Sequence, residues 1–399
     1  MEKRINTLSQ QIPAFDTPLH VGRPNVGDRE RLIGRIEGIL DRHWLTNRGT
    51  LVEKLESRLQ DYLGVRHCIS MCNGTVALEI AIRALGLEGE VIVPSFTFIA
   101  TAHALQWQEI TPVFCDIAPA THNIDPERIE ALITPRTTGI IGVHVWGKPC
   151  DTEPLQALSH RHGLRLMFDG AHAFGCSHKG TMIGNFGECE VFSFHATKVF
   201  NTFEGGAVAT NNDDLAEKIR LMQNFGFSGL DKVIYIGTNG KMNEACAAMG
   251  LTNLESLDGF METNRRNYHI YRKRLARIPG IRLLPYDTSE KSNWQYVVLE
   301  IDDTEYGTSR DDLMENLHTK GVRARRYFYP GCHRMEPYQS YYPHSHLLLP
   351  ATERLCNRVL QLPTGTGVTH EDILAICTII EEAQWPKKTC IQKKTVTVP

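Results

Sequence analysis

Lys198 lies in the stretch SFHATKVFNTFEGG, between an apolar run and a pair of glycines. A lysine that follows a strand can form an imine with a bound aldehyde, because its neutral amine is a nucleophile. Such an amine needs a pKa that burial and neighbouring groups lower towards ~7–8. Taken alone, a lysine of this kind is more often a solvated charge in a loop. The nucleophilic interpretation therefore depends on what other residues the sequence brings to it.

Asp169 ends the apolar run in LRLMFDGAHAFG and precedes two small residues, Gly170 and Ala171. An ionised aspartate at a buried strand end is costly unless it is paired. A protonated pyridine nitrogen is a suitable partner, and the pair keeps the ring a strong electron sink. Ala171 is small enough to let a ring lie flat against it. The alternative is an aspartate that caps the start of a helix.

A third segment, MCNGTVALEIAIRALG, places Asn73, Gly74 and Thr75 at the start of a strongly periodic helix. The free N–H groups and the dipole at such a start form an anion site suited to phosphate. Gly74 lets the backbone approach a ligand closely. Many helices begin in this way for stability alone, so the segment is informative only together with the other two.

Composition places the chain among ordinary globular proteins. It has 399 residues, 42% hydrophobic and 22% charged, with a formal net charge of −3. No basic cluster of the kind that binds nucleic acid is present. No run approaches the ~20 apolar residues that cross a bilayer, and the first residues lack the apolar core of a signal peptide. The eleven cysteines are scattered without a Cys-x-x-Cys pair, which predicts reduced thiols in a cytoplasmic protein.

Short apolar runs alternate with helical stretches over about residues 26–245. The runs are rich in Val, Ile and Phe without polar alternation, which indicates strands buried on both faces of a mainly parallel sheet. The expected strands are EVIVPSF, TPVFCDI, TTGIIGVHVWG, LRLMFDGA, CEVFSFHA and GGAVAT, and the expected helices between them cover 75–86, 98–107, 125–133, 151–162 and 213–224. The sequence therefore predicts an α/β fold with a large domain of sheet covered by helices.

The chain divides into four expected parts: an N-terminal arm at 1–25, a large domain at 26–250, a small domain at 251–385 and a tail at 386–399. The stretch from Asn243 to Ile278 contains no proline and predicts one long helix that bridges the two domains. Beyond it, IRLLP, NWQYVVLEI and VRARRYFYP alternate with helical stretches at 309–319, 351–359 and 369–383. This alternation predicts a smaller α+β domain at the C-terminal end.

The segment GVRARRYFYPGCHRMEPY holds three arginines among aromatic residues, namely Arg323, Arg325 and Arg326. Arginine binds phosphate bidentately, so some of the three could face a substrate phosphate. A solvated edge strand is an equally good interpretation. Cys332, His333, His344 and His346 lie close together in sequence, but their spacing matches no common tetrahedral zinc pattern, so no metal site is expected.

Together, the three chemical segments resemble those of the fold type I aminotransferases, which use pyridoxal 5′-phosphate (PLP). More narrowly, the chain resembles the DegT/DnrJ/EryC1/StrS family of sugar aminotransferases over about residues 30–383. The stretches that carry the resemblance are WLTNRGTLVEKLE, CNGTVALEIAIRALG, EVIVPSFTFIATAHA, FDGAHAFG, SFHATKVFNTFEGGAVAT, GTNGKMNEACAAMGL and LQLPTGTGV.

The resemblance implies a role for each matching residue. Lys198 would hold PLP covalently and move a proton between cofactor and substrate, and Asp169 would bind the pyridine nitrogen. The other residues implied to bind the cofactor are Phe98 and Ala171 on the two ring faces, His172 near the 3-hydroxyl group, and Gly74, Thr75 and Ser193 at the phosphate.

Asn239, in GTNGKMNE, resembles an asparagine that reaches the phosphate of a neighbouring subunit, which implies a homodimer with shared active sites. Family members often carry tyrosine or arginine close to this motif, whereas Gly240 and Lys241 follow here. Asn243 is therefore a rival for the same role.

The resemblance implies transfer of an amino group from L-glutamate to a nucleotide-linked keto sugar. His195 in SFH and Glu204 in EGG resemble branches that aminate a 4-keto carbon, and ARRYFYPGCH resembles enzymes that make 4-amino-4,6-dideoxy sugars on dTDP. Amination of a 3-keto sugar is the alternative within the family. Related dehydratases have histidine at the lysine position, so Lys198 favours transamination. An alternative of another class is a PLP-binding regulatory protein without turnover.

Overall fold

The computed structural model describes Phe15 and residues 17–384. The predicted tail at 386–399 lies outside the described residues, as does most of the predicted arm at 1–25. The described part of the arm includes strand β1 (Leu19–His20), which pairs in parallel with β13 (Val322–Arg323) near the other end of the chain. The four-part division of the chain stays a prediction.

Residues 67–210 contain a seven-stranded sheet with the strand order β2-β10-β9-β6-β5-β3-β4. Strands β4, β3, β5, β6 and β9 run parallel, while β10 is antiparallel to both β9 and β2. The strands are β2 (His67–Met71), β3 (Glu90–Pro94), β4 (Thr111–Cys115), β5 (Thr137–Val143), β6 (Arg165–Asp169), β9 (Cys189–Ser193) and β10 (Gly206–Thr210). The mainly parallel sheet predicted from the apolar runs is confirmed.

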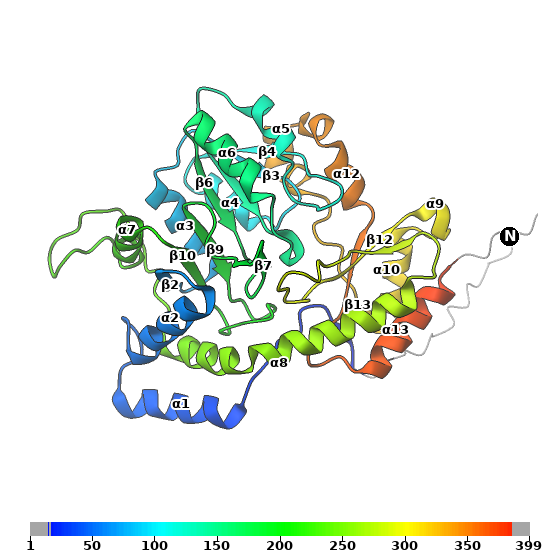
Figure 1. Cartoon of the computed structure of the whole chain (residues 1–399), viewed down its shortest axis with the longest axis horizontal. Helices are drawn as coiled ribbons and strands as arrows, with labels where there is room; N and C mark the ends of the chain where they lie inside the picture. Colours follow the sequence, from blue (N-terminus) through cyan, green and yellow to red (C-terminus); the bar gives the residue numbers. More distant parts are fainter. Residues whose placement is uncertain (1–14, 16, 385–399) are drawn as a thin grey trace, which may run out of the picture.

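Helices cover both faces of this sheet (Figure 1). In β3, Val91 and Val93 pack in the core beneath α3, α4 and α7, whereas Ile92 packs on the opposite face with α5 and α6. This alternation explains why the three central residues of the strand are all apolar. The helices of this part are α1 (Arg29–Arg42), α2 (Thr50–Leu63), α3 (Gly74–Leu85), α4 (Ala100–Gln106), α5 (Pro126–Ile129), α6 (Thr152–His162) and α7 (Asp213–Gln223).

Helix α8 (Glu244–Leu275) is the predicted bridging helix and runs beneath both parts of the molecule in Figure 1. Its first turns pack on α2, and its last turns pack on α13 (His370–Glu382). A three-stranded antiparallel sheet completes this end of the chain. Its strands, in spatial order, are β11 (Ile281–Leu283), β12 (Val297–Ile301) and β14 (Val359–Leu362).

The shorter elements complete the chain. They are β7 (Ser177–His178), β8 (Thr181–Met182), α9 (Asp303–Tyr306), α10 (Arg310–Thr319), α11 (Tyr338–Tyr341) and α12 (Pro350–Cys356), with single 3₁₀ turns at Glu130–Leu132, Val145–Gly147, Cys332–Arg334 and Ser345–Leu348. Within the described ranges, none of the helices is both long and apolar enough to cross a membrane.

Three local expectations were wrong or incomplete. VRARRYFYP was expected to form a strand, but only Val322 and Arg323 do so, and the rest is irregular apart from one bridge between Arg325 and Gln361. Strand β2 was missed because HCISM mixes polar and apolar residues, although its Ser70 is fully buried. Strand β14 was missed because it follows α12 after a turn of only two residues.

Candidate active site

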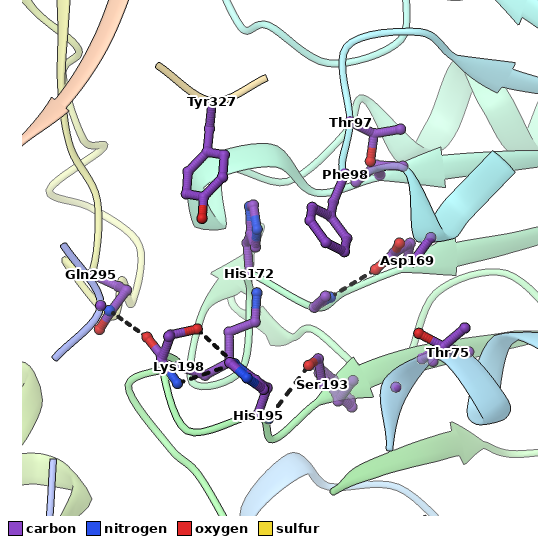
Figure 2. A pocket seen from close by; sticks show the side chains of 18 of the residues that line it. Thr75, Thr97, Phe98, Asp169, His172, Ser193, His195, Lys198, Gln295 and Tyr327 are labelled. Carbon is purple, nitrogen blue, oxygen red and sulfur yellow. Dashed lines mark hydrogen bonds between the residues drawn. The ribbon is translucent and has the colours of Figure 1, made fainter. Parts of the chain in front are cut away.

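A cavity of about 290 Å³ opens at the carboxyl ends of the parallel strands, where ligands of open α/β sheets commonly bind. One side of the cavity is lined by residues that follow β3, β6 and β9, together with the start of α3. Residues that precede β12 and residues after β13 close it from the C-terminal part of the chain. Figure 2 shows Phe98, Asp169, His172, Ser193 and Lys198 around the same space.

Lys198 extends its side chain into this cavity from the loop between β9 and β10 (Figure 2). Two internal hydrogen bonds hold this loop closed: the Lys198 N–H donates to the His195 carbonyl at 2.9 Å, and the Thr202 N–H donates to the Phe194 carbonyl at 2.9 Å. Burial lowers the pKa of Lys198 to about 8, although the nearby Asp169 carboxylate acts in the opposite direction. The amine is therefore partly neutral near pH 7, as a nucleophile requires.

Asp169 is the last residue of β6 and is only 5% exposed. Its Oδ2 accepts a hydrogen bond from Thr101 Oγ1 at 2.8 Å, and its Oδ1 accepts one from the Ala171 N–H at 3.0 Å. Burial raises the pKa of Asp169, while these two donors and the Lys198 charge favour the ionised form. The next element in the chain is strand β7, so Asp169 does not cap a helix.

His172 lies on the wall of the cavity, with its ring 4.6 Å from that of Tyr296. Its Nδ1 accepts a hydrogen bond from the Trp146 N–H at 3.2 Å. Burial, together with the Lys198 charge, holds the pKa of His172 well below its usual range. The imidazole is therefore neutral and carries its proton on Nε2, which leaves Nε2 as a hydrogen-bond donor.

The N-terminus of α3 forms an anion cradle at one end of the cavity. Asn73 Oδ1 accepts from the Val76 N–H at 2.8 Å, which caps the helix. Within the described residues, the Gly74 and Thr75 N–H groups donate to no protein atom. A Cβ added at Gly74 would lie 2.9 Å from the Ser193 Cβ, so a larger residue would fill the space beside the Ser193 hydroxyl. The donor set therefore suits a phosphate group.

Two further predicted residues lie where a flat ring would fit. The Phe98 side chain is 55% exposed although it lies at the cavity, so one face of its ring is uncovered. Ala171 lines the cavity next to Asp169. His195 also lines it, with Nδ1 2.9 Å from Thr197 Oγ1 and Nε2 3.4 Å from Glu204 Oε1.

Asn239 lies outside this cavity, in the long loop between α7 and α8 that projects from the molecule in Figure 1. Its side chain is exposed and makes no hydrogen bond within the part of the chain that the structure describes. Asn243 is engaged locally, because its Oδ1 accepts from the Cys246 N–H at 2.8 Å and caps α8. The two rivals therefore differ: Asn239 is available to a partner, and Asn243 is committed to its own helix.

The three arginines also lie outside the cavity lining. Arg326 pairs with Asp311 at 2.8 Å and stacks over Tyr329. Arg325 is exposed and lies over the ring of Tyr327, which does line the cavity, while Arg323 is exposed on β13. Of the three arginine side chains, that of Arg325 lies against the ring of a cavity residue.

The residues considered for zinc have other partners. His333 Nδ1 lies 2.7 Å from Ser95 Oγ, its Nε2 lies 2.5 Å from Glu353 Oε1, and Cys332 Sγ donates to the Thr97 carbonyl. His346 Nδ1 lies 3.2 Å from the Pro343 carbonyl oxygen. Over residues 17–384, no group of three or more His, Cys, Asp or Glu side chains is arranged to hold a metal ion.

Sequence reasoning missed Thr101, Gln295 and Tyr327. Thr101 holds Asp169 from α4, and its position within FTFIATAHA, three residues after Phe98, was the available signal. Gln295 and Tyr327 reach the cavity from the segments before β12 and after β13. Nothing in their local sequence marks them, because their placement depends on how these segments pack against the loops that follow the parallel strands.

Comparisons with known proteins agree with this geometry. The model of the DegT/DnrJ/EryC1/StrS aminotransferase family matches residues 27–381. The dTDP-4-amino-4,6-dideoxy-D-glucose transaminase of Shigella dysenteriae is 39% identical over 316 residues, which are 79% of this chain and 86% of that protein. The Escherichia coli protein of the same name is 34% identical over 368 residues, 92% of this chain and 98% of that one.

Solved structures give the same result. The crystal structure of DesI in the presence of its TDP-sugar product is 49% identical and superimposes with a TM-score of 0.89, over 93% of this chain and 94% of that one. DesV of S. venezuelae, in complex with a ketimine intermediate, is 29% identical with a TM-score of 0.83, over 92% and 99%. The resemblance seen in the sequence motifs is confirmed, and the chain belongs to the DegT/DnrJ/EryC1/StrS family of aminotransferases.

Proposed function

We propose that this protein is a PLP-dependent aminotransferase that moves an amino group from L-glutamate to a nucleotide-linked 4-keto-6-deoxy sugar. The observation that carries the proposal is the meeting of Lys198 and Asp169 in one cavity, beside a helix N-terminus with free N–H groups. The three segments that supply these groups are far apart in sequence.

The residues present fit PLP. The Gly74 and Thr75 N–H groups and the Ser193 hydroxyl would hold the phosphate, and the missing side chain at Gly74 lets the start of α3 approach Ser193. Phe98 and Ala171 would lie against the two faces of the ring, and the His172 Nε2–H would donate towards the ring hydroxyl. Each Asp169 oxygen accepts one protein hydrogen bond and keeps a lone pair for the pyridine nitrogen.

When bound, PLP supplies an aldehyde carbon that amines attack and a ring that accepts electron density. The protein's own contribution is to bind, orient and move protons. Asp169, fixed by Thr101 and the Ala171 N–H, keeps a negative charge at the far side of the ring. The Lys198 amine, with a pKa of about 8, is able both to accept and to return a proton at Nζ near neutral pH.

The sugar substrate is proposed from the relatives. The Shigella dysenteriae and Escherichia coli relatives are named as dTDP-4-amino-4,6-dideoxy-D-glucose transaminases, and DesI was crystallised with a TDP-sugar product. A relative from Caulobacter vibrioides, 34% identical, is named GDP-perosamine synthase. We assign dTDP to this chain because the name of the 39% identical Shigella protein specifies dTDP, and the 49% identical DesI was crystallised with a TDP-sugar.

We further propose a homodimer in which Asn239 of one subunit completes the phosphate site of the other. The exposed Asn239 side chain supports this, as do the exposed apolar residues of the same projecting loop, Phe225, Leu230 and Ile236. A cytoplasmic location is proposed from the scattered cysteines, of which those from Cys68 to Cys377 are free thiols in the described part of the chain.

The test is the reaction itself. Purified protein with PLP, L-glutamate and dTDP-4-keto-6-deoxyglucose should form 2-oxoglutarate and a dTDP-4-amino-4,6-dideoxy sugar, with the nitrogen located by NMR. Lys198→Ala should form neither, and Lys54→Ala, on the exposed face of α2, should behave as the unmodified protein. Amination at C3 would overturn the 4-keto assignment but not transamination. Failure of glutamate to aminate the bound cofactor would leave the regulatory alternative.

A further inference from the structure

The main-chain carbonyls of the two residues next to Lys198, Thr197 and Val199, each accept a hydrogen bond from a side-chain amide in another part of the chain. Gln295 Nε2 donates to the Thr197 carbonyl at 3.1 Å, and Asn25 Nδ2 donates to the Val199 carbonyl at 3.2 Å. Figure 2 shows the first of these bonds beside Lys198. Both amide side chains are buried, at 5% and 2% exposed.

The orientation of the Gln295 amide is fixed by its other end. Its Oε1 accepts from Asn264 Nδ2 at 3.4 Å, and its main-chain N–H donates to Asn293 Oδ1 at 3.1 Å. Since the oxygen is already engaged by a donor, the nitrogen must face Thr197. Both ends of the Gln295 amide are therefore hydrogen-bonded, so its nitrogen stays directed at the Lys198 loop.

Asn25 is oriented in the same way. Its Oδ1 accepts from Thr366 Oγ1 at 2.9 Å and from the Thr366 N–H at 3.3 Å. Its own carbonyl accepts from Asn201 Nδ2 at 2.9 Å. One buried asparagine therefore joins the N-terminal segment, the loop after β14 and the Lys198 loop.

The N-terminal segment also lies directly on the loop. A Cβ added at Gly22 would come within 2.8 Å of the Thr197 Cβ, and Val21 and Gly22 line the cavity beside Lys198. Neither Asn25 nor Gln295 belongs to the seven-stranded sheet that carries Lys198. The position of the Lys198 backbone is consequently set by two segments outside its own sheet.

We propose that Gln295 and Asn25 form an amide clamp whose function is to position Lys198 for proton transfer. The inference rests on the proposed role of Lys198. Both are positioning residues, because they act through the main-chain carbonyls of Thr197 and Val199, the residues before and after the lysine. A four-carbon side chain is flexible, so a fixed backbone is what returns Nζ to the reacting carbon, where displacements of about 1 Å have large effects on rate.

The first test uses the cofactor-free protein and amide hydrogen exchange. Gln295→Met and Asn25→Leu keep side-chain volume and remove the donor. Exchange in the peptide 194–202 should become about tenfold faster or more, because each change leaves a buried carbonyl without its donor. Gln108→Met and Asn185→Leu are matched controls, since each removes a side-chain amide that donates to two main-chain carbonyls elsewhere. They should leave that peptide unchanged.

The second test uses the PLP-loaded protein and glutamate deuterated at the α-carbon. In the clamp variants, kcat should fall about tenfold with KM for glutamate roughly unchanged, and the protium-to-deuterium rate ratio should rise. A purely structural role would lower the amount of active protein without changing that ratio. The ratio therefore reports on proton transfer and not on folding.

The outcomes separate the two proposals. If the unmodified protein neither binds PLP covalently nor aminates it, the proposed function fails, while the exchange experiment still tests the clamp. Exchange in 194–202 that stays at the unmodified rate, or that rises equally in the controls, overturns the clamp. If a variant does not fold, Gln295→Asn and Asn25→Ala are measured against the same criteria.

Discussion

Gly74 and Ser193 approach so closely that a Cβ built on Gly74 would lie 2.9 Å from the Ser193 Cβ and 3.3 Å from its Oγ. The first residue of α3 is thereby pressed against the last residue of β9. The contact brings the free helix N–H groups and the Ser193 hydroxyl to one point, so the phosphate site depends on the absence of a side chain at Gly74.

Gly74→Ala should therefore weaken PLP binding by about tenfold to a hundredfold, since overpacking of this kind costs roughly 1–3 kcal/mol. Titration of cofactor-free protein with PLP measures the effect. Affinity for pyridoxal, which lacks the phosphate, should change much less. Gly259→Ala is the control, because a Cβ added at that position on α8 meets nothing within 4 Å. Equal losses for PLP and pyridoxal would place the phosphate elsewhere.

Lys198→Ala should fold and bind PLP without any covalent link, and it should turn over nothing. Borohydride treatment of the unmodified holoprotein should leave a pyridoxyl label on Lys198, detected by peptide mass spectrometry, and the variant should take up no label. The physical reason is that burial makes Lys198 a partly neutral amine inside the cavity. Normal activity in Lys198→Ala would end the proposed function.

Asp169→Asn should reduce kcat by roughly a thousandfold or more, because each 1.36 kcal/mol in the barrier is a factor of ten and the lost charge keeps the ring protonated. Single-turnover conversion of the bound cofactor by glutamate measures this step. Asp116→Asn is the matched control. Asp116 follows a strand and, like Asp169, is 5% exposed, but its carboxylate accepts hydrogen bonds from Thr352 and from the Ala351 N–H. That control should lose stability and keep its catalytic rate. An Asp169→Asn enzyme within threefold of the unmodified one would make Asp169 a structural residue.

The sequence alone predicted the strands that carry the proposed catalytic residues. It did not predict the residues that hold those catalytic residues in place through hydrogen bonds. The strands that end at Asp169 and Ser193 have apolar, buried centres, Leu166–Phe168 and Val191–Phe192, because both faces of the sheet are covered, and this pattern is local. The donors to Asp169 and to the Lys198 loop are not local. Thr101 and Gln295 become neighbours of these residues only when separate elements pack, and no periodicity marks that event.

Tertiary contacts that local sequence does not show also explain why the strand predicted for VRARRYFYP does not form beyond Arg323. Its aromatic and β-branched residues favour a strand, but Tyr327 and Phe328 line the cavity instead of joining a sheet. Arg326, weighed as a phosphate ligand, pairs with Asp311 on α10. Both outcomes depend on tertiary contacts that override local propensity.

The rate at which cofactor-free protein captures PLP covalently should rise with pH and level off above a midpoint near 8. Burial disfavours the charged ammonium and lowers the pKa of Lys198 to about 8, so the neutral nucleophile predominates above that value. Absorbance changes across a pH series give the midpoint. Asp169→Asn should move the midpoint lower, because the Asp169 carboxylate acts to raise the Lys198 pKa. A midpoint near the ordinary lysine value would contradict the buried environment of the amine.

Mixing two inactive variants should restore activity if active sites are shared between subunits. A Lys198→Ala protomer keeps its Asn239, and an Asn239→Ala protomer keeps its Lys198, so each heterodimer would contain one site with both residues intact. Activity measured after mixing should therefore rise well above that of either variant alone, and sedimentation should show a dimer.

Asn243→Ala replaces Asn239→Ala as the control in this experiment. Asn243 caps α8 through the Cys246 N–H, so its removal should cost about 1 kcal/mol of stability and leave turnover in place. The Asn243→Ala protomer should be active by itself. The activity of its mixture with Lys198→Ala should therefore not exceed the sum of the activities of the two separate variants. The reverse pattern, with Asn243→Ala inactive and complemented, would assign the partner's phosphate contact to Asn243. A monomeric enzyme with full activity would remove the shared site altogether.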